Sequence, residues 1–287
     1  MAKALTEPGP LQISVDYRFD PLRLHARAPQ RYPFLLESTA QGTAQGRSDL
    51  LMGFPGQVLD SRGSKDGVFL ERLDRAWHAA ALNDDGPAAP FAGGWFLLLG
   101  YELAAQIETS LDLPTDSELP VALAVRVRAA LVRDHARREA WLVAEPGAAA
   151  LLEDMQRDLR SAAATPADDV RAPLAAVIEE ESPARFLAAV EKAKGYIAAG
   201  DIFQANLSRQ WRASLQAGCH PHELYARLRR SNPGPFAGLA SFDDFAVVSS
   251  SPERLVQVRE GRVSTRPIAG TRPRRNRDQD EPMRSEL

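Results

Sequence analysis

The sequence predicts a protein of the α+β class, and three observations support that prediction. Short apolar runs of β type, separated by turns rich in glycine and proline, extend from Tyr32 to about Val143. Apolar residues at helical spacing follow in the last third of the chain, after Ser182. Hydrophobic residues make up 44% and charged residues 25%, as in a folded globular chain.

Length, charge and cysteine content exclude several classes. A chain of 287 residues forms one large or two modest domains. Its net charge of −3 argues against binding nucleic acid or a membrane surface through bulk charge. The N-terminus has no signal-peptide core, and no segment reaches the ~18 apolar residues of a membrane span. A single cysteine, Cys219, forms no internal disulfide and no thiolate metal site, so we expect a cytoplasmic protein.

In the first half of the chain, strands are predicted at Trp95–Leu99 and over the run from Val121 to Arg128. The alternating positions of Arg126 and Arg128 in the second run are typical of a strand with one solvated face. A helix is predicted from Ala148 to Ser161. Residues 162–173 then show no apolar period and read as a linker or surface loop.

After the linker, a helix is expected to begin at Ser182, as the capping residue, with Pro183 in its first turn. Gly200 is placed to end this helix in a left-handed conformation. One face of the helix carries four apolar residues at helical spacing, namely Phe186, Val190, Ala193 and Ile197.

Further elements are predicted toward the C-terminus. A second helix, at about 222–230, should stop before Pro233, because a residue that precedes proline avoids the helical region. A strand at Phe245–Ser249 and a hairpin that turns at Glu260-Gly261 follow. The expected domains are therefore 1–161, a linker over 162–181, and 182–287. Since residues 278–287 show no closing element, we expect the last domain to be truncated.

The segment Gly200–Ser208 (GDIFQANLS) is the first of three motifs. It predicts a strand with Gln204, Asn206 and Ser208 on one face. Two interpretations of that polar face remain open. It is either solvated or buried in a ligand pocket, where the amides would need hydrogen-bond partners.

The second motif, SSSPER, places Glu253 on a loop at the carboxyl end of an apolar strand. A carboxylate held there suits general acid–base catalysis if partial burial raises its pKa. The alternative is a surface ion pair between Glu253 and Arg254. In the third motif, RPIAGT, Gly270 either lets the backbone approach a ligand carboxylate or simply makes a tight turn.

In their order and spacing, GDIFQANLS, NPGPF, SSSPER and RPIAGT resemble the motifs of the chorismate-utilising enzymes. That family includes anthranilate synthase component I, aminodeoxychorismate synthase component I, isochorismate synthase and salicylate synthase. The resemblance extends into the N-terminal half through FLLES at 34–38 and through Gly100-Tyr101-Glu102-Leu103. It implies a two-lobed β-sandwich core with peripheral helices, like that of anthranilate synthase component I.

An N-terminal half of this type implies one of the two members that work with an amidotransferase. The run from Gly100 to Leu103 favours the aminodeoxychorismate branch, which serves 4-aminobenzoate and folate synthesis. Ala269 departs from the pattern of that branch, whose members often carry at this position a lysine that attacks the substrate ring. Alanine at this position is typical of anthranilate synthases. Alanine has no nucleophile, so no covalent adduct forms at this nucleophile-equivalent position. Anthranilate synthase component I is the alternative, and a non-catalytic fragment that binds tryptophan or a partner is another.

The resemblance assigns roles to individual residues. It makes Glu253 the proton donor for loss of the ring C4 hydroxyl, and it places Gly270 and Thr271 at the substrate carboxylate. It also implies a tryptophan pocket. The loop that closes this pocket, at residues 45–48, matches the loop of relatives only at Arg47. The pocket residues are Ser38, Gln45, Gly46, Arg47, Ser48, Pro235, Phe236 and Ala237.

The resemblance further implies partners and a metal. A glutamine amidotransferase, component II, would supply ammonia in a heterodimer, and chorismate would be the substrate. Relatives carry their Mg²⁺-binding glutamates beyond the RPIAGT motif, so we expect no metal ligands within this chain. We therefore expect residues 1–287 alone to have no synthase activity, because the developing charge would lack its counterion.

Overall fold

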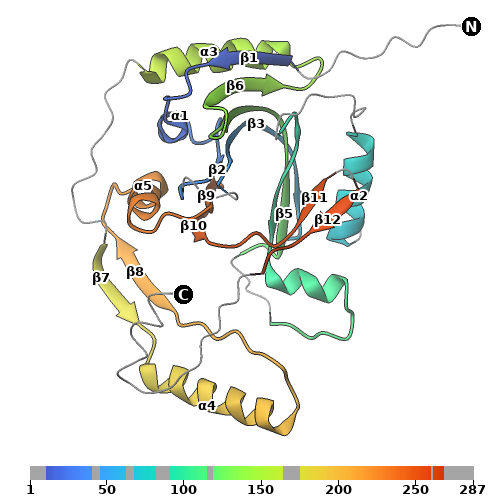
Figure 1. Ribbon diagram of the computed structural model, residues 1–287, viewed down its shortest axis with the longest axis vertical. Helices are drawn as coiled ribbons and strands as arrows, with labels where there is room; N and C mark the ends of the chain where they lie inside the picture. The colour runs from blue at the N-terminus through green and yellow to red at the C-terminus, as the bar shows by residue number, and fades with distance from the viewer. Residues whose placement is uncertain are drawn as a thin grey trace, which may run out of the picture. The chain divides into compact units, whose positions relative to one another are not determined.

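Figure 1 shows the computed structural model of the chain, which describes residues 11–40, 46–62, 68–81, 91–114, 119–163, 175–259 and 261–267. The chain divides into two compact units, of which the first joins residues 1–167 with 225–287 and the second holds residues 168–224. The domain boundaries expected from the sequence stay a prediction. Within the described ranges, no helix is both long and apolar enough to span a bilayer.

The first unit is built on an antiparallel sheet of eight strands. These are β1 (Leu11–Val15), β2 (Phe34–Glu37), β3 (Ser48–Asp60), β4 (Gly94–Leu99), β5 (Ala122–Asp134), β6 (Glu139–Ala144), β9 (Phe236–Ser241) and β10 (Ala246–Ser251). Their order is β1-β6-β5-β3-β2-β9-β10, and β4 pairs separately with β5. Strands from both ends of the chain therefore share one sheet.

Strands β3 and β5, each 13 residues long, belong to two branches of this sheet. The first half of β5 pairs with β4, and its second half pairs with β6. The register of β3 shifts between Pro55 and Val58, and Phe54 just before the shift has a φ of 57°. A bulge of this kind bends the strand and increases its twist, which lets the two branches diverge.

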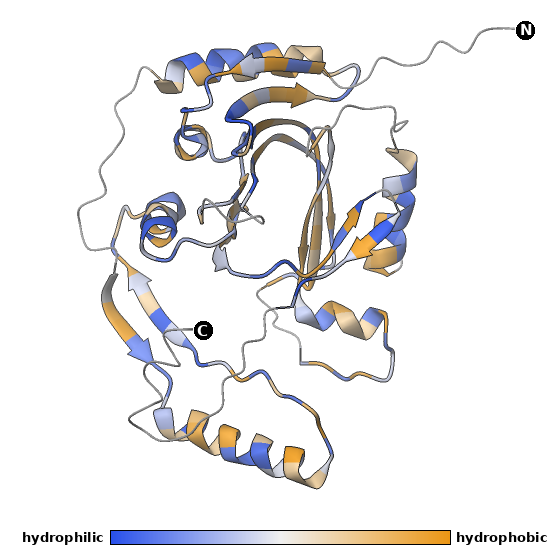
Figure 2. Ribbon diagram, in the orientation of Figure 1, coloured by the Kyte–Doolittle hydropathy of each residue, from blue (hydrophilic) through white to orange (hydrophobic). Residues whose placement is uncertain are grey.

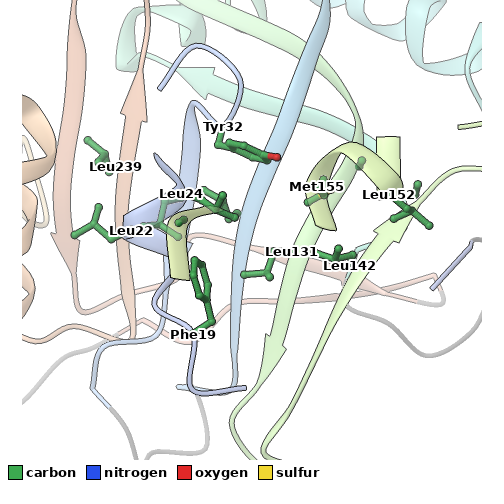
Figure 3. Close-up of a cluster of buried hydrophobic side chains, with 14 of the residues drawn as sticks. Phe19, Leu22, Leu24, Tyr32, Leu131, Leu142, Leu152, Met155 and Leu239 are labelled. Carbon is green, nitrogen blue, oxygen red and sulfur yellow. The ribbon is translucent and has the colours of Figure 1, made fainter. Parts of the chain in front are cut away.

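One face of the sheet is covered by three helices, α1 (Pro21–Arg27), α3 (Ala149–Ala163) and α5 (Pro221–Ser231). Figure 3 shows Leu131 and Leu142 of the sheet beside Leu152 and Met155 of α3, all of them buried. Aliphatic side chains of this size each contribute about 1.5–3 kcal/mol when they leave water. This cluster is the main core of the unit.

The opposite face of the sheet packs against the sheet itself. Phe34 of β2 stacks on Phe96 of β4, with ring centroids 4.0 Å apart and planes 5° apart, although β2 and β4 are not paired. Met52 and Val125 complete this second core. Such packing is the sandwich that the family resemblance implies. Figure 2 shows the central strands as mainly hydrophobic ribbon.

Two shorter elements cover the branch that contains β4. They are α2 (Phe69–Ala79) and the 3₁₀ helix η1 (Tyr101–Gln106). Phe69 and Leu103 from these elements are buried against Leu59 of β3. The predicted hairpin is also present, as β11 (Gln257–Arg259) and β12 (Arg262–Ser264), and Gly261 in its turn has a φ of 71°.

The second unit contains a two-stranded sheet of β7 (Ala175–Glu180) and β8 (Trp211–Leu215), together with α4 (Pro183–Ala199). Gly200 ends α4 with a φ of 82°, which confirms the predicted left-handed cap. The side chain of Ser182 precedes the helix but makes no capping hydrogen bond. No residue of α4 is buried.

The strand predicted within 200–208 is wrong. The structure has no strand there, and the ladder with β7 begins only at Trp211. Gln204 and Asn206 are exposed and face each other through their amides at 3.5 Å. Alternating polarity does not make a strand when no neighbouring backbone supplies the hydrogen bonds of a ladder.

Candidate functional site

Ser38 lies at the end of β2, at the centre of the residues expected to form the tryptophan pocket. Its backbone N–H donates to Oδ1 of Asp49 over 2.8 Å. Its Oγ lies 3.1 Å from the carbonyl oxygens of both Ser48 and Pro235. The structure therefore brings together three of the predicted residues from three separate segments, and Ser38 itself is buried.

The other residues predicted for this pocket lie around Ser38. Ala237 is buried in β9, directly opposite Glu37 of β2. Phe236 begins β9 and is partly exposed. Arg47 pairs with Asp134 at 3.1 Å, and just over half of its side chain is exposed. Gln45 lies outside the described residues, whereas the neighbouring Gly46 is buried and Ser48 opens β3.

Behind Ser38 lies a buried ionic network that the sequence analysis missed. Asp49 is its first centre: Oδ2 pairs with Arg133 at 2.5 Å, and Oδ1 lies 2.9 Å from Nε2 of His135. The Nδ1 atom of His135 is in turn 2.8 Å from the hydroxyl of Tyr17. Asp49 thus holds the Ser38 backbone while its own charge is compensated by Arg133.

Glu37 is the second centre of the network and is 4% exposed. The Tyr225 hydroxyl donates to it over 2.9 Å, and Arg229 of α5 approaches both of its oxygens at 3.1 and 3.2 Å. Burial raises the pKa of Glu37, although Arg229 opposes that shift. Arg133 reaches Glu37 at 3.4 Å and so joins the two centres.

Asp20 extends this network to the start of α1. Its carboxylate caps the helix by accepting from the N–H of Leu22, and it pairs with Arg229 at 2.5 Å. Burial disfavours ionised Asp20, but the hydrogen bonds and charge of Arg229 outweigh that effect and lower its pKa. Removing one partner of such a pair leaves the other charge uncompensated. The network therefore fixes α1, α5, β2 and β5 relative to one another.

The sequence contains one indication of this ionic network. Glu37 follows three apolar residues in the run Phe34-Leu35-Leu36-Glu37-Ser38, where a charge needs a partner if the strand is buried. Its partners lie far away in the sequence, with Tyr225 at a separation of 188 positions. No local pattern identifies such a pair.

Glu253, the expected proton donor, follows the end of β10 on a loop, as predicted. Its backbone forms a small turn with Ser251, whose Oγ donates to the Glu253 carbonyl oxygen over 2.9 Å. The same Oγ accepts from the Glu253 N–H at 3.3 Å. Glu253 is exposed, so the partial burial expected to raise its pKa is not found in the structure, and no ion pair joins it to Arg254 within the part of the chain that the structure describes.

Three predicted residues, Ala269, Gly270 and Thr271, lie outside the described residues. The structure therefore leaves their roles as predictions. Among the residues that are described, no three His, Cys, Asp or Glu side chains form a group able to hold a metal ion. These described residues therefore do not offer a site for Mg²⁺.

A branched antiparallel sheet, folded on itself and covered by helices on its outer face, is the fold class of anthranilate synthase component I. The crystal structure of that protein from Streptococcus pneumoniae TIGR4 matches with a TM-score of 0.65 and 22% identity, over 85% of this chain and 57% of that one. The family model described as chorismate binding enzyme matches residues 31–287. The chain belongs to the chorismate-binding enzyme family.

Curated relatives include members with two different names. Anthranilate synthase component 1 of Cereibacter sphaeroides is 34% identical over 84% of this chain and 54% of its own length. The protein of that name from Thermus thermophilus is 34% identical over 93% of this chain and 60% of its own. Aminodeoxychorismate synthase component 1 of Klebsiella aerogenes is 30% identical over 91% of this chain and 58% of its own length. The chain thus spans little more than half the length of these relatives.

Proposed function

We propose that the protein containing this chain aminates chorismate with ammonia, as component I of a two-component synthase. Membership of the chorismate-binding family is the observation that supports this most directly. Relatives named as component 1 of aminodeoxychorismate and anthranilate synthases add to it. A glutamine amidotransferase, component II, would then supply the ammonia.

Glu253 is the residue we assign to proton transfer. It lies exposed after the carboxyl end of β10, with its backbone fixed by Ser251, so the burial that a proton donor requires has to come from the bound substrate. In the proposed reaction it donates the proton with which the C4 hydroxyl leaves as water, while ammonia supplies the new C–N bond. General acid assistance of this kind contributes about 10²–10⁴-fold to a rate.

For the product we favour 4-amino-4-deoxychorismate over anthranilate. The sequence from Gly100 to Leu103 supports this choice, and in the structure it forms the turn from β4 into η1. The Gly100 N–H donates to the Val121 carbonyl over 2.8 Å, and a Cβ at Gly100 would come within 2.9 Å of that oxygen. Anthranilate is the second candidate, because Ala269 favours it and three of the relatives with that name are at least 31% identical.

The two products are distinguished by one assay. The complete gene product is incubated with chorismate, an ammonium salt and Mg²⁺, and the products are separated and identified by mass. We expect aminodeoxychorismate, which yields 4-aminobenzoate after treatment with its lyase. Fluorescent anthranilate would move the assignment to tryptophan biosynthesis. If chorismate is not consumed at all, the proposed amination is wrong.

A further inference from the structure

The segment Asn232–Phe236 joins the surroundings of Ser38 to the loop that carries Glu253. On one side, the Gly234 carbonyl accepts hydrogen bonds from the N–H groups of Thr39 and Ala40, at 2.9 and 3.2 Å. The next carbonyl, of Pro235, lies 3.1 Å from the Ser38 hydroxyl oxygen. The backbone of this segment is therefore fixed by the end of β2.

On its other side, the same segment packs against the end of β10. The hydroxyl of Ser250 donates to the carbonyl of Asn232. A Cβ at Gly234 would lie 2.9 Å from both the Ser250 Oγ and the Ser251 carbonyl oxygen, so only glycine allows this approach. Phe236 pairs in register with Ser251, the last residue of β10. Two residues after Ser251 comes Glu253.

Arg254 makes the last contact of this series. Its guanidinium carbon lies 5.7 Å from the centre of the Phe236 ring. Its Nε is buried and has no hydrogen-bond partner among the described residues, so no hydrogen bond at that atom competes with the contact to the ring. Glu253 next to it is exposed. The two adjacent side chains thus occupy different environments, one against Phe236 and one in solvent.

We propose that Arg254 is a positioning residue, which fixes the loop through its cation–π contact with Phe236 and so presents the Glu253 carboxyl group to the substrate. This inference rests on the proposed role of Glu253 as proton donor. A planar guanidinium suits stacking on an aromatic face, and lysine does not replace it there. Displacement of a catalytic group by about 1 Å can cost about 10²-fold in rate, so an anchor next to that group affects turnover.

The test measures kcat and KM for chorismate in the complete gene product. Arg254→Ala and Phe236→Leu are each expected to lower kcat about tenfold or more, with KM changed less than about threefold. Phe236→Tyr keeps the ring and should retain nearly full turnover, whereas Arg254→Lys keeps only the charge and should resemble Arg254→Ala. Arg262→Ala, on the exposed strand β12, is the matched control and should leave both constants unchanged.

The decisive comparison repeats Arg254→Ala in a Glu253→Gln background. Because Arg254 acts through Glu253, we expect no further loss of kcat in the double variant. If the two losses multiply, the positioning role is wrong while the role of Glu253 stands. If Glu253→Gln alone costs less than tenfold, the proton-donor role fails, and the positioning role fails with it. Should Arg254→Ala not fold, Arg254→Lys carries the same comparison.

Discussion

The hydroxyl of Tyr225 donates a hydrogen bond to the carboxylate of Glu37 over 2.9 Å, and both side chains are buried. Tyr225 belongs to α5 and Glu37 to the end of β2, so this bond attaches a late helix to an early strand. Burial raises the pKa of the Tyr225 hydroxyl, and the neighbouring Glu37 charge raises it further. Tyr225 therefore acts as a donor at all ordinary pH values.

Tyr225→Phe should lower the free energy of unfolding by about 1–3 kcal/mol, because a buried acceptor loses its partner. Urea unfolding at neutral pH, followed by tryptophan fluorescence, measures the change. Tyr101→Phe is the matched control, since Tyr101 is 83% exposed and should lose almost nothing. Equal midpoints for Tyr225→Phe and the unaltered protein would show that the hydrogen bond contributes little.

Asp20→Asn should lower the free energy of unfolding at neutral pH but not in acid. Asparagine keeps the helix cap but loses the ion pair with Arg229. Because folding lowers the pKa of Asp20, its contribution is present above the ordinary value of 3.8 and is lost as the pH falls through the folded-state value. The Asp20 side chain is partly exposed, so we expect a difference of about 1 kcal/mol.

The measurement for Asp20 is the unfolding free energy of both proteins from pH 7 down to the acid limit of folding. The gap between them should shrink as the pH falls below 3.8. Asp243→Asn, at an exposed position, is the control and should follow the unaltered protein throughout. A gap that stays constant with pH would exclude the ionic contribution.

Gly93→Ala should be among the most damaging single changes in the chain. Gly93 has a φ of 121°, and a Cβ there would overlap the carboxylate of Glu145, which is buried and pairs with Arg126 at 2.5 Å. We expect a loss above about 3 kcal/mol, from strain and from disruption of a buried charge. Gly147→Ala isolates the strain, because Gly147 has a φ of 77° with open space around it.

Thermal unfolding of the two glycine variants gives the comparison. Gly147→Ala should cost only about 1–2 kcal/mol, the usual cost of a left-handed non-glycine residue. If both variants lose the same amount, the close approach of Gly93 to Glu145 is unimportant and only its backbone angle matters.

Glu253→Gln should lower kcat in the complete gene product by about 10²–10⁴-fold while chorismate affinity stays nearly unchanged. The amide keeps the size of the side chain but has no proton of suitable acidity to give the departing hydroxyl. Steady-state kinetics with ammonia, together with chorismate binding by calorimetry, separates the two effects. A loss below tenfold would assign Glu253 a structural role.

At position 269 we expect no covalent intermediate. Alanine offers no nucleophile, so intact-protein mass spectrometry of the complete gene product with chorismate and without ammonia should show no added mass. Ala269→Lys should be tolerated, because the small native side chain implies room beside the ring. An adduct on the native peptide that contains Arg266 to Arg272 would contradict this view of the site.

Local patterns predicted much of the fold. The apolar run at Trp95–Leu99 became β4, and the expected helix from Pro183 ends at Gly200 as predicted. The strand starting near Val121 proved longer than expected and runs to Asp134, because it is buried along most of its length and its arginines form ion pairs. Alternation alone could not indicate that, since the ion pair of Arg126 depends on Glu145, which follows the end of β6.

Some residues of the candidate site could likewise be placed from local sequence patterns, and others could not. The position of Glu253 after a strand was predictable from proline and the apolar run before it. The convergence of Ser38, Ser48 and Pro235 required a family resemblance, because these residues meet only through the pairing of β2 with β3 and β9. Asp49, Arg133 and His135 were missed altogether. Their importance comes from burial at one point, which no spacing in the sequence expresses.

The contacts of the ionic network can form only late in folding, because its members lie far apart in the sequence. Asp49 and His135 are 86 positions apart, and Glu37 and Tyr225 are 188 apart, so their contacts must wait for the closure of long loops. Non-local pairing of this kind is typical of folding in milliseconds to seconds rather than microseconds. During synthesis at about 5–20 residues per second, β2 leaves the ribosome many seconds before α5 does. Over that interval Glu37 has no Tyr225 or Arg229 to pair with, and the nascent sheet is exposed to chaperones and proteases.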